Sequence, residues 1–280
     1  MKNWKKMMMW LMCLLDLITM SKRFKYLISS ILSALGFFMF VGLPYESRYF
    51  GLMAGMVLVM FCFWFGLGIV FTDDFDLRMM SVILPTFFFA GFGLFIALIP
   101  YSFASAVFFS LVFGVVYYVL FLVENVFMVA IGYKTVPLYR AAYTVSLIIL
   151  LLTAFFMFDT LFSFRLFFVW NVLGVAIISA IIFLYQFWAV AIELSDDGKG
   201  KDRRGFVLWP TVVLTEISLC LSFLPTGIFK GSVYLVAIIY ILSGLIQAEI
   251  RDRLFKRTYM MYVWTMVALV LAILLATRWR

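Results

Sequence analysis

The sequence contains no histidine among its 280 residues. This absence removes the usual general base near neutral pH and the commonest metal ligand. It therefore excludes Ser-His-Asp and Cys-His catalysis, His-zinc sites and His-ligated haem. Cysteine is also scarce, since Cys13, Cys62 and Cys220 are far apart and each lies in an apolar segment. We therefore expect no disulfide framework, no cysteine metal site and no bound cofactor.

Charged residues are also few, at 13% of the chain, whereas 66% of the residues are hydrophobic and 20% aromatic. A soluble domain has about 25% charged residues, and a soluble core of this size could not bury so much apolar surface. The composition therefore predicts a polytopic membrane protein. The net charge is +8, but the basic residues lie in short loops between apolar segments. Their position indicates membrane topology and contact with anionic lipids rather than nucleic-acid binding.

Nine apolar segments, separated by short polar breaks, are candidates to cross a bilayer. Each is expected to be helical, because a backbone in hydrocarbon has to satisfy its own hydrogen bonds. We therefore predict an all-α membrane helix bundle with about nine transmembrane helices. The expected spans are Tyr26–Val41, Phe50–Phe71, Met79–Ile99, Phe103–Ile131, Ala141–Phe158, Leu166–Ile192, Phe206–Leu224, Val233–Ile246 and Tyr259–Thr277.

Lysine and arginine are distributed unevenly between alternate loops. With a cytoplasmic N-terminus, 17 of the 22 basic residues lie on the cytoplasmic side and five on the outer side. This asymmetry predicts that the N-terminus is inside and the C-terminus outside. Residues 1–25 hold a shorter apolar segment with basic flanks, which predicts a cytoplasmic-side interfacial helix; the alternative is that residues 7–20 cross the membrane. Residues 26–280 are expected to form a single membrane domain.

Candidate binding residues are the polar side chains inside the predicted spans. Glu124 and Asn125 are adjacent near the cytoplasmic end of the fourth span, and Arg140 follows across the next loop. A carboxylate inside a membrane costs a few kcal/mol or more and usually faces protein or water. We expect Glu124 to pair with Arg140. The pair would either lock the helical hairpin or form part of a substrate or proton site.

Glu216 lies near the middle of the seventh predicted span, at a depth where no span carries a positive charge. Its candidate hydrogen-bond partners are two amides of the sixth span, Asn171 and Gln186. An ionisable residue at this depth indicates either a functional site or a structural hydrogen bond. If any side chain of this protein carries a proton, we expect it to be Glu216.

Two acidic clusters lie in loops that are predicted to be cytoplasmic. They are Asp73, Asp74 and Asp76 after the second span and Asp196, Asp197 and Asp202 after the sixth. Two such clusters could hold magnesium and a pyrophosphate. The layout resembles that of the UbiA-type prenyltransferases, which have nine spans and aspartate-rich motifs in these two loops. Only the topology is similar, because the second cluster lacks DxxxD spacing, and solvated loops are the alternative. We assign no metal ligand.

A second resemblance rests on the segments LPTFFFAGFGLFIALIP, VENVFMVAIGYKTVPLYRAA and LTAFFMFDTLFSF. They resemble a family of uncharacterised bacterial multi-pass inner-membrane proteins over roughly residues 80–257. In that family an acid–Asn pair, a following Arg and a span-ending Asp occur in this order. The corresponding residues here are Glu124, Asn125, Arg140 and Asp159. The resemblance implies a helix bundle in a bacterial inner membrane and implies no activity.

Three classes of function are compatible with these features. The first is a structural or accessory subunit that contacts lipid or a partner membrane protein, and short loops and few buried charges favour it. The second is a transporter or carrier that uses Glu216 and Glu124 as its ionisable groups. The third is an aspartate- and magnesium-dependent lipid-linked transferase. We favour the first class, and hence not an enzyme, and leave the oligomeric state open.

Overall fold

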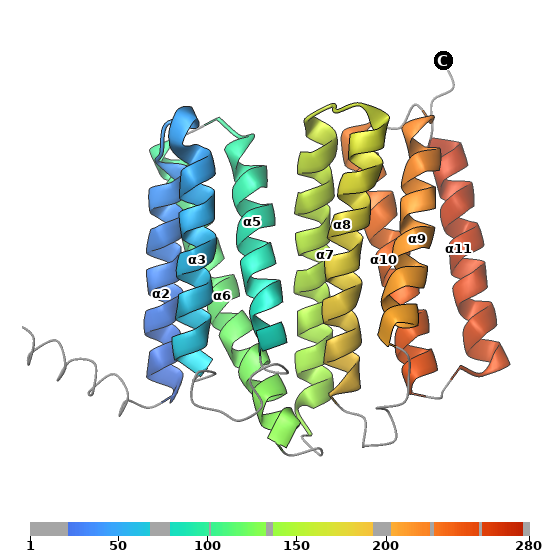
Figure 1. The fold of residues 1–280 in the computed structure, drawn as a ribbon, viewed down its shortest axis with the longest axis horizontal. Helices are drawn as coiled ribbons and strands as arrows, with labels where there is room; N and C mark the ends of the chain where they lie inside the picture. Colours follow the sequence, from blue (N-terminus) through green and yellow to red (C-terminus); the bar gives the residue numbers. More distant parts are fainter. Residues whose placement is uncertain are drawn as a thin grey trace, which may run out of the picture.

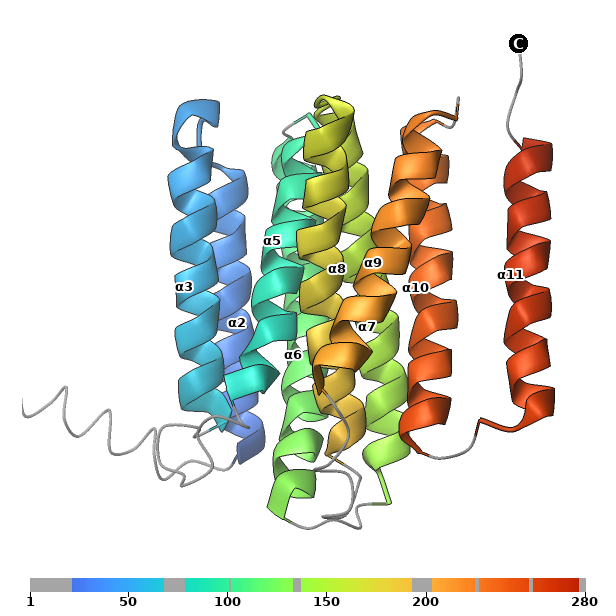
Figure 2. The same cartoon turned by 45° about the vertical axis from the view of Figure 1, so that its right-hand side comes forward.

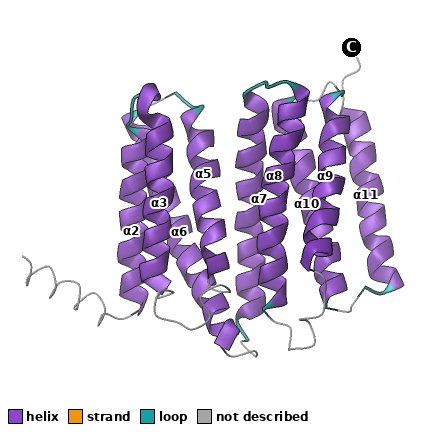
Figure 3. Ribbon diagram, viewed as in Figure 1, coloured by secondary structure: helices purple, strands orange, loops and turns teal. Residues whose placement is uncertain are grey.

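The computed structural model describes residues 22–67, 79–100, 102–132, 137–192, 203–224, 227–251 and 254–276. Within these ranges all regular elements are helical, and nine helices are long and apolar enough to cross a membrane (Figure 3). The predicted all-α membrane bundle is confirmed. The elements are α2 (Lys22–Val41), η1 (Tyr45–Ser47), α3 (Arg48–Leu67), η3 (Met80–Val82), α5 (Ile83–Ala97), α6 (Phe103–Gly132), α7 (Tyr139–Ser163), α8 (Phe168–Ala191), α9 (Arg203–Ser222), α10 (Ile228–Ile250) and α11 (Lys256–Ala276).

Successive long helices run in opposite directions, so α2 begins at the lower end of the bundle and α11 finishes at the upper end (Figure 1). We call the lower end the basic end, because α2, α7, α9 and α11 begin there with basic residues in their first turns. These residues include Lys25, Arg140, Arg204, Lys256 and Arg257, whereas Arg48, Arg165 and Lys230 belong to the opposite end. The predicted cytoplasmic orientation of the basic end stays a prediction.

Several helices extend beyond the predicted spans. The first long helix begins at Lys22 rather than at Tyr26, so the last residues of the predicted interfacial segment belong to α2. The rest of that segment, residues 1–21, lies outside the described residues. Helix α10 is longer than its predicted span at both ends and includes Lys230 and Glu249 in its terminal turns. A charged side chain at a helix end can reach the interface, so it does not end the helix.

The long helices form two groups that lie side by side. Helices α2, α3, α5 and α6 pack together, as do α7, α8, α9 and α10, and contacts of α5 and α6 with α7 join the groups (Figure 1). Helix α11 packs mainly on α10 and stands at the edge of the bundle (Figure 2). Only 6% of the α11 span is buried, compared with 61% of the span that contains α5.

Phenylalanine rings fill the space between α2, α3, α5 and α6. Phe37 of α2 stacks on Phe113 of α6 with 4.3 Å between the ring centroids. Phe63 of α3 stacks on Phe121 of α6 at 3.9 Å. All four rings are fully buried. Such pairs contribute about 0.5–1.5 kcal/mol each beyond the area they bury, so this group of helices is held together mainly by ring packing.

Two glycines of α3 allow these rings to reach the helix backbone. A Cβ atom added at Gly55 would lie 2.1 Å from the ring of Phe89, and one added at Gly66 would lie 2.7 Å from the ring of Phe121. Small residues at membrane helix interfaces allow this kind of close approach. The two glycines therefore serve packing within the chain.

Candidate functional site

Glu124 lies in the interior of the bundle, where side chains from three helices meet. Its side chain on α6 is 0% exposed, and the Tyr185 hydroxyl of α8 donates a hydrogen bond to Oε1 over 2.7 Å. That hydroxyl also lies 2.9 Å from Oγ of Ser146 on α7. The second oxygen, Oε2, has no hydrogen-bond partner in the described part of the chain. Oε1 of the carboxyl therefore accepts a hydrogen bond, whereas Oε2 can accept a further hydrogen bond or a proton.

A second polar layer lies next to this carboxyl, toward the basic end. The amide of Gln186 on α8 donates a hydrogen bond to the Tyr143 hydroxyl of α7. The guanidinium carbon of Arg251, at the end of α10, lies 5.8 Å from the centre of the Tyr143 ring. The Tyr139 hydroxyl donates to the backbone carbonyl of Ala189. Together the two layers connect α6, α7, α8 and α10 through polar side chains.

Asn125 points to a different neighbour from Glu124. The Tyr26 hydroxyl of α2 donates a hydrogen bond to its Oδ1 over 2.8 Å. Successive residues of an α-helix are about 100° apart around the axis, so adjacent side chains face different neighbours. The acid–amide pair is therefore divided: the acid joins α6 to α7 and α8, and the amide joins α6 to α2.

The expected ion pair between Glu124 and Arg140 is not formed. Arg140 is exposed at the start of α7, whereas the carboxyl binds Tyr185. Ser146 marks the level of this carboxyl on α7. Arg140 precedes Ser146 by six residues, or about 9 Å along the helix axis. The prediction was wrong because adjacency across a loop does not place two side chains at the same depth.

Glu216 lies on the outward face of α9 and is exposed. It occupies a stripe of exposed apolar side chains one helical turn apart, with Val212 before it and Leu219 and Cys220 after it. Neither expected amide partner reaches it, because Gln186 donates to Tyr143 and Asn171 donates to a backbone carbonyl. The carboxyl therefore faces away from the bundle.

Asn171 lines a cleft of about 250 Å³ at the end of the bundle opposite the basic end. The cleft lies between the end of α7, the start of α8, the end of α9 and the start of α10. The side-chain amide of Asn171 donates to the carbonyl of Leu166 over 3.1 Å. Its Oδ1 and the Oγ of Ser218, which also lines the cleft, are buried without a hydrogen-bond partner among the described residues. Ser218 is on the face of α9 opposite Glu216, so this cleft does not serve that carboxyl.

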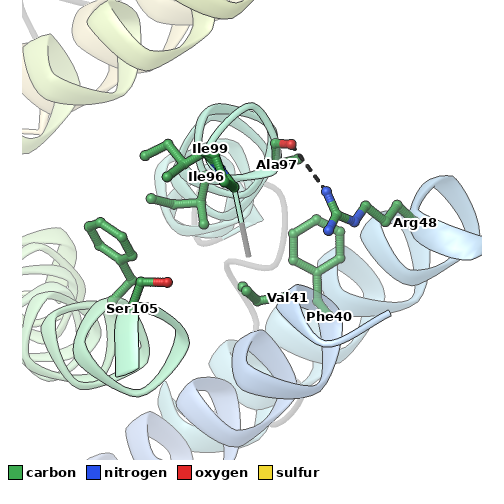
Figure 4. A pocket seen from close by; sticks show the side chains of 9 residues that line it. Phe40, Val41, Arg48, Ile96, Ala97, Ile99 and Ser105 are labelled. Carbon is green, nitrogen blue, oxygen red and sulfur yellow. Dashed lines mark hydrogen bonds between the residues drawn. The ribbon is translucent and has the colours of Figure 1, made fainter. Parts of the chain in front are cut away.

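Arg48 contributes to a much smaller cavity at the same end, with a volume of about 10 Å³. Its guanidinium points to the carbonyl of Ala97 at the end of α5 and donates a hydrogen bond over 3.1 Å (Figure 4). It also donates to the carbonyl of Leu43 and lies 3.9 Å from the centre of the Tyr45 ring. A cavity of this size holds about one water molecule. Arg48 therefore connects the end of α5 to the loop between α2 and α3.

The two acidic clusters, residues 73–76 and 196–202, lie outside the described residues. Within the described ranges, no group of three His, Cys, Asp or Glu side chains is arranged to hold a metal ion. Asp159, near the end of α7, is half-buried and within hydrogen-bonding reach of Ser232 on α10.

Sequence reasoning missed the partners of Glu124. Tyr185 and Ser146 lie in apolar segments, and neither was among the candidate binding residues. A usable signal was present, because a buried phenol or amide usually requires a hydrogen-bond partner. The adjacent Tyr185 and Gln186, deep in the sixth span, marked the helix face toward which Glu124 points.

No protein-family model, curated protein or solved structure matches this chain. The two resemblances seen in the sequence therefore stay predictions, and the function is argued from the residues.

Proposed function

We propose that the chain is an accessory subunit of an assembly in a bacterial inner membrane, and that it binds a partner transmembrane protein over the face of α9 that carries Glu216. The observation that carries the proposal is the outward position of this carboxyl. The side chains around it on the same face, including Leu208, Val212 and Leu219, are apolar and exposed. The predicted excess of basic residues in the cytoplasmic loops supports the choice of membrane.

The depth of Glu216 makes its outward position costly. Helix α9 extends over 20 residues, and the carboxyl is 13 residues from its first residue and six from its last. These separations correspond to about 20 Å and 9 Å along the axis, and we infer from them that the carboxyl lies within the hydrocarbon. An acidic side chain facing lipid costs about 2.5 kcal/mol or more at the bilayer centre and less toward the interface, so Glu216 carries part of this cost. Covering it with protein that supplies a hydrogen bond removes this cost.

The chemistry of the partner follows from the same residue. A basic side chain or a hydrogen-bond donor at the depth of Glu216 would complement the carboxyl. None of the nine predicted spans contains a lysine or an arginine, so a second copy of this chain could not supply a cation at that depth. A different membrane protein is therefore the better occupant of this face.

Photocrosslinking in native membranes tests the proposal. One photoreactive residue replaces Val212, one turn from Glu216 on the same face. A matched control replaces Val115, an outward-facing residue of α6 that is 66% exposed. We expect a discrete protein adduct from position 212, none from position 115, and loss of the adduct in the Glu216→Leu variant.

The mass of the adduct distinguishes a second copy from a different protein. Lipid adducts alone at position 212, or a protein adduct that survives the Glu216→Leu change, would contradict the proposal. Expression and detergent elution of Glu216→Leu serve as the folding control. Removing an outward carboxyl from an apolar face is expected to leave both unchanged.

A second candidate function, a proton carrier, is favoured by one observation at Glu124. Its Oε2 is buried and has no hydrogen-bond partner among the described residues. Intramembrane acids that face the bundle interior often belong to proton pathways. The test is proton flux into liposomes that contain the purified protein. Flux that Glu124→Gln abolishes and that Glu46→Gln, at an exposed acid, leaves intact would favour the carrier. The absence of flux above that of empty liposomes would exclude it.

A further inference from the structure

A crevice of about 510 Å³ lies between α9, α10 and α11 at the basic end of the bundle. Its walls are mostly apolar side chains from all three helices, among them Phe206, Trp209, Leu242, Ile246 and Tyr259. The volume falls within the range of about 300–1,000 Å³ that is usual for small-molecule sites. The crevice is thus large enough for a substantial apolar group.

The crevice is open to its surroundings because α11 stands at the edge of the bundle (Figure 2). Trp209 is 73% exposed and Tyr259 is 51% exposed. Tryptophan and tyrosine are enriched where hydrocarbon meets the headgroups. Tyr259, in the first turn of α11, marks the end of the crevice nearest the headgroups, and the apolar walls, Trp209 among them, extend from there toward the depth of acyl chains.

Basic residues lie within three positions of lining residues on all three helices. Lys256 and Arg257 are exposed in the first turn of α11, and Arg204 is exposed in the first turn of α9. Arg251 follows the last residue of α10. Glu249 is the acidic residue that lines the crevice in the described part of the chain. The starts of α9 and α11 add the partial positive charge of two helix N-termini. The rim is therefore complementary to a phosphate.

We propose that the crevice binds an anionic diacyl phospholipid from the leaflet at the basic end. One acyl chain lies between α9, α10 and α11 against Trp209, and the phosphate contacts Lys256 and Arg257. Basic pockets between transmembrane helices bind anionic headgroups by this combination of charge and apolar contact. Trp209 precedes Glu216 by seven residues, nearly two helical turns along the same side of α9, so the crevice adjoins the proposed partner surface and the Glu216→Leu variant is needed to distinguish the two.

Fluorescence quenching of Trp209 tests the proposal on the full-length protein in nanodiscs. The discs contain phosphatidylcholine and a fixed fraction of phosphatidylglycerol, with brominated chains on one lipid or the other. The contribution of Trp209 is obtained by subtracting the emission of a Trp209→Phe variant. We expect brominated phosphatidylglycerol to quench this contribution more strongly than brominated phosphatidylcholine present at the same fraction.

Separate variants test the contribution of the basic rim and that of the apolar crevice to lipid binding. Lys256→Gln and Arg257→Gln are each expected to weaken the preference for the anionic lipid about fivefold, and added salt should weaken it further. Val213→Phe fills the crevice and leaves the cations in place, so it should reduce quenching by both lipids. The matched control is Lys230→Gln at the opposite end, which should leave the preference unchanged.

Equal quenching of Trp209 by the two lipids would overturn the proposal, and so would a preference that survives both rim substitutions. Glu216→Leu separates this site from the partner surface. It should abolish the protein crosslink and leave the lipid preference unchanged, so that either proposal can fail without the other.

Discussion

The two groups of helices are held together by different chemistry. Helices α2, α3, α5 and α6, which we call the aromatic half, meet through buried phenylalanine rings. Helices α7, α8, α9 and α10, which we call the polar half, contain hydroxyl, amide and guanidinium contacts between helices and a polar cleft. Glu124 belongs to the aromatic half by its helix and to the polar half by its contacts. The contrast is one of degree, because the Tyr26–Asn125 and Arg48–Ala97 hydrogen bonds also join helices of the aromatic half.

The lipid that surrounds the helices explains why ring packing and hydrogen bonds are the main contacts between them. Lipid tails are as apolar as a leucine side chain, so the hydrophobic effect does not drive two membrane helices together. Close ring packing and hydrogen bonds remain as the main attractions. The stability of the aromatic half should depend on how closely its rings pack. Substitutions that remove side-chain volume from its interior should therefore destabilise it. The stability of the polar half should depend on its hydrogen bonds. Substitutions that remove a hydrogen-bond partner from its interior should therefore destabilise it.

The largest expected effect is loss of a ring from the aromatic half. Phe113→Ala removes a fully buried side chain that contacts the rings of Phe37, Phe89 and Tyr117. We expect the free energy of unfolding to fall by about 3 kcal/mol, because a cavity remains. Unfolding by denaturing detergent measures it. Phe108→Ala, at an exposed ring of the same helix, should change it by less than about 0.5 kcal/mol. Equal losses would show that buried ring packing does not stabilise the aromatic half.

A smaller effect is expected from loss of a hydrogen bond in the polar half. Tyr185→Phe keeps the ring and removes the donor to Glu124, leaving the carboxyl with neither oxygen bonded to a described residue. We expect a loss of about 1–3 kcal/mol, measured by the same unfolding assay. The control is Tyr49→Phe at an exposed ring of α3. If Tyr185→Phe had the same free energy of unfolding as the unmodified protein, the hydrogen bond between Tyr185 and Glu124 would not contribute to stability.

The smallest effect is expected at Arg140. Its exposed side chain is not joined to Glu124, so Arg140→Gln should change the free energy of unfolding by less than about 0.5 kcal/mol. A double-mutant cycle with Glu124→Gln should show a coupling energy close to zero. A coupling above about 1 kcal/mol would show that the two side chains interact in the membrane.

Hydrophobic length predicted the fold correctly. Nine segments such as Phe103–Ile131 are apolar over enough residues to cross a bilayer, and the corresponding helix, α6, ends one residue later. Boundaries failed where a charge lies within a terminal turn, as with Lys230 in α10. Length and hydropathy describe how far a helix extends, and they do not include the reach of a long charged side chain toward the interface.

The candidate site was predicted in its residues and not in its contacts. Glu124 was recognised as an intramembrane acid, but its partner Tyr185 is 61 residues away and belongs to a helix that is apolar on most sides. Glu216 was recognised as an intramembrane acid, whereas its outward direction was not predicted, and its depth in the membrane stays a prediction. A signal was present, because Thr211 and Ser218 recur at helical spacing on the side of α9 opposite Glu216 and are buried.

The central claim is that protein covers the carboxyl of Glu216 in the native membrane. A map from electron cryomicroscopy of the protein, extracted with its surrounding lipids and partners, tests this most directly. The account predicts a helix of another protein against α9, with a donor within about 3 Å of the Glu216 carboxyl. Acyl-chain density along α9 on both sides of Glu216, with no protein against it, would contradict the account.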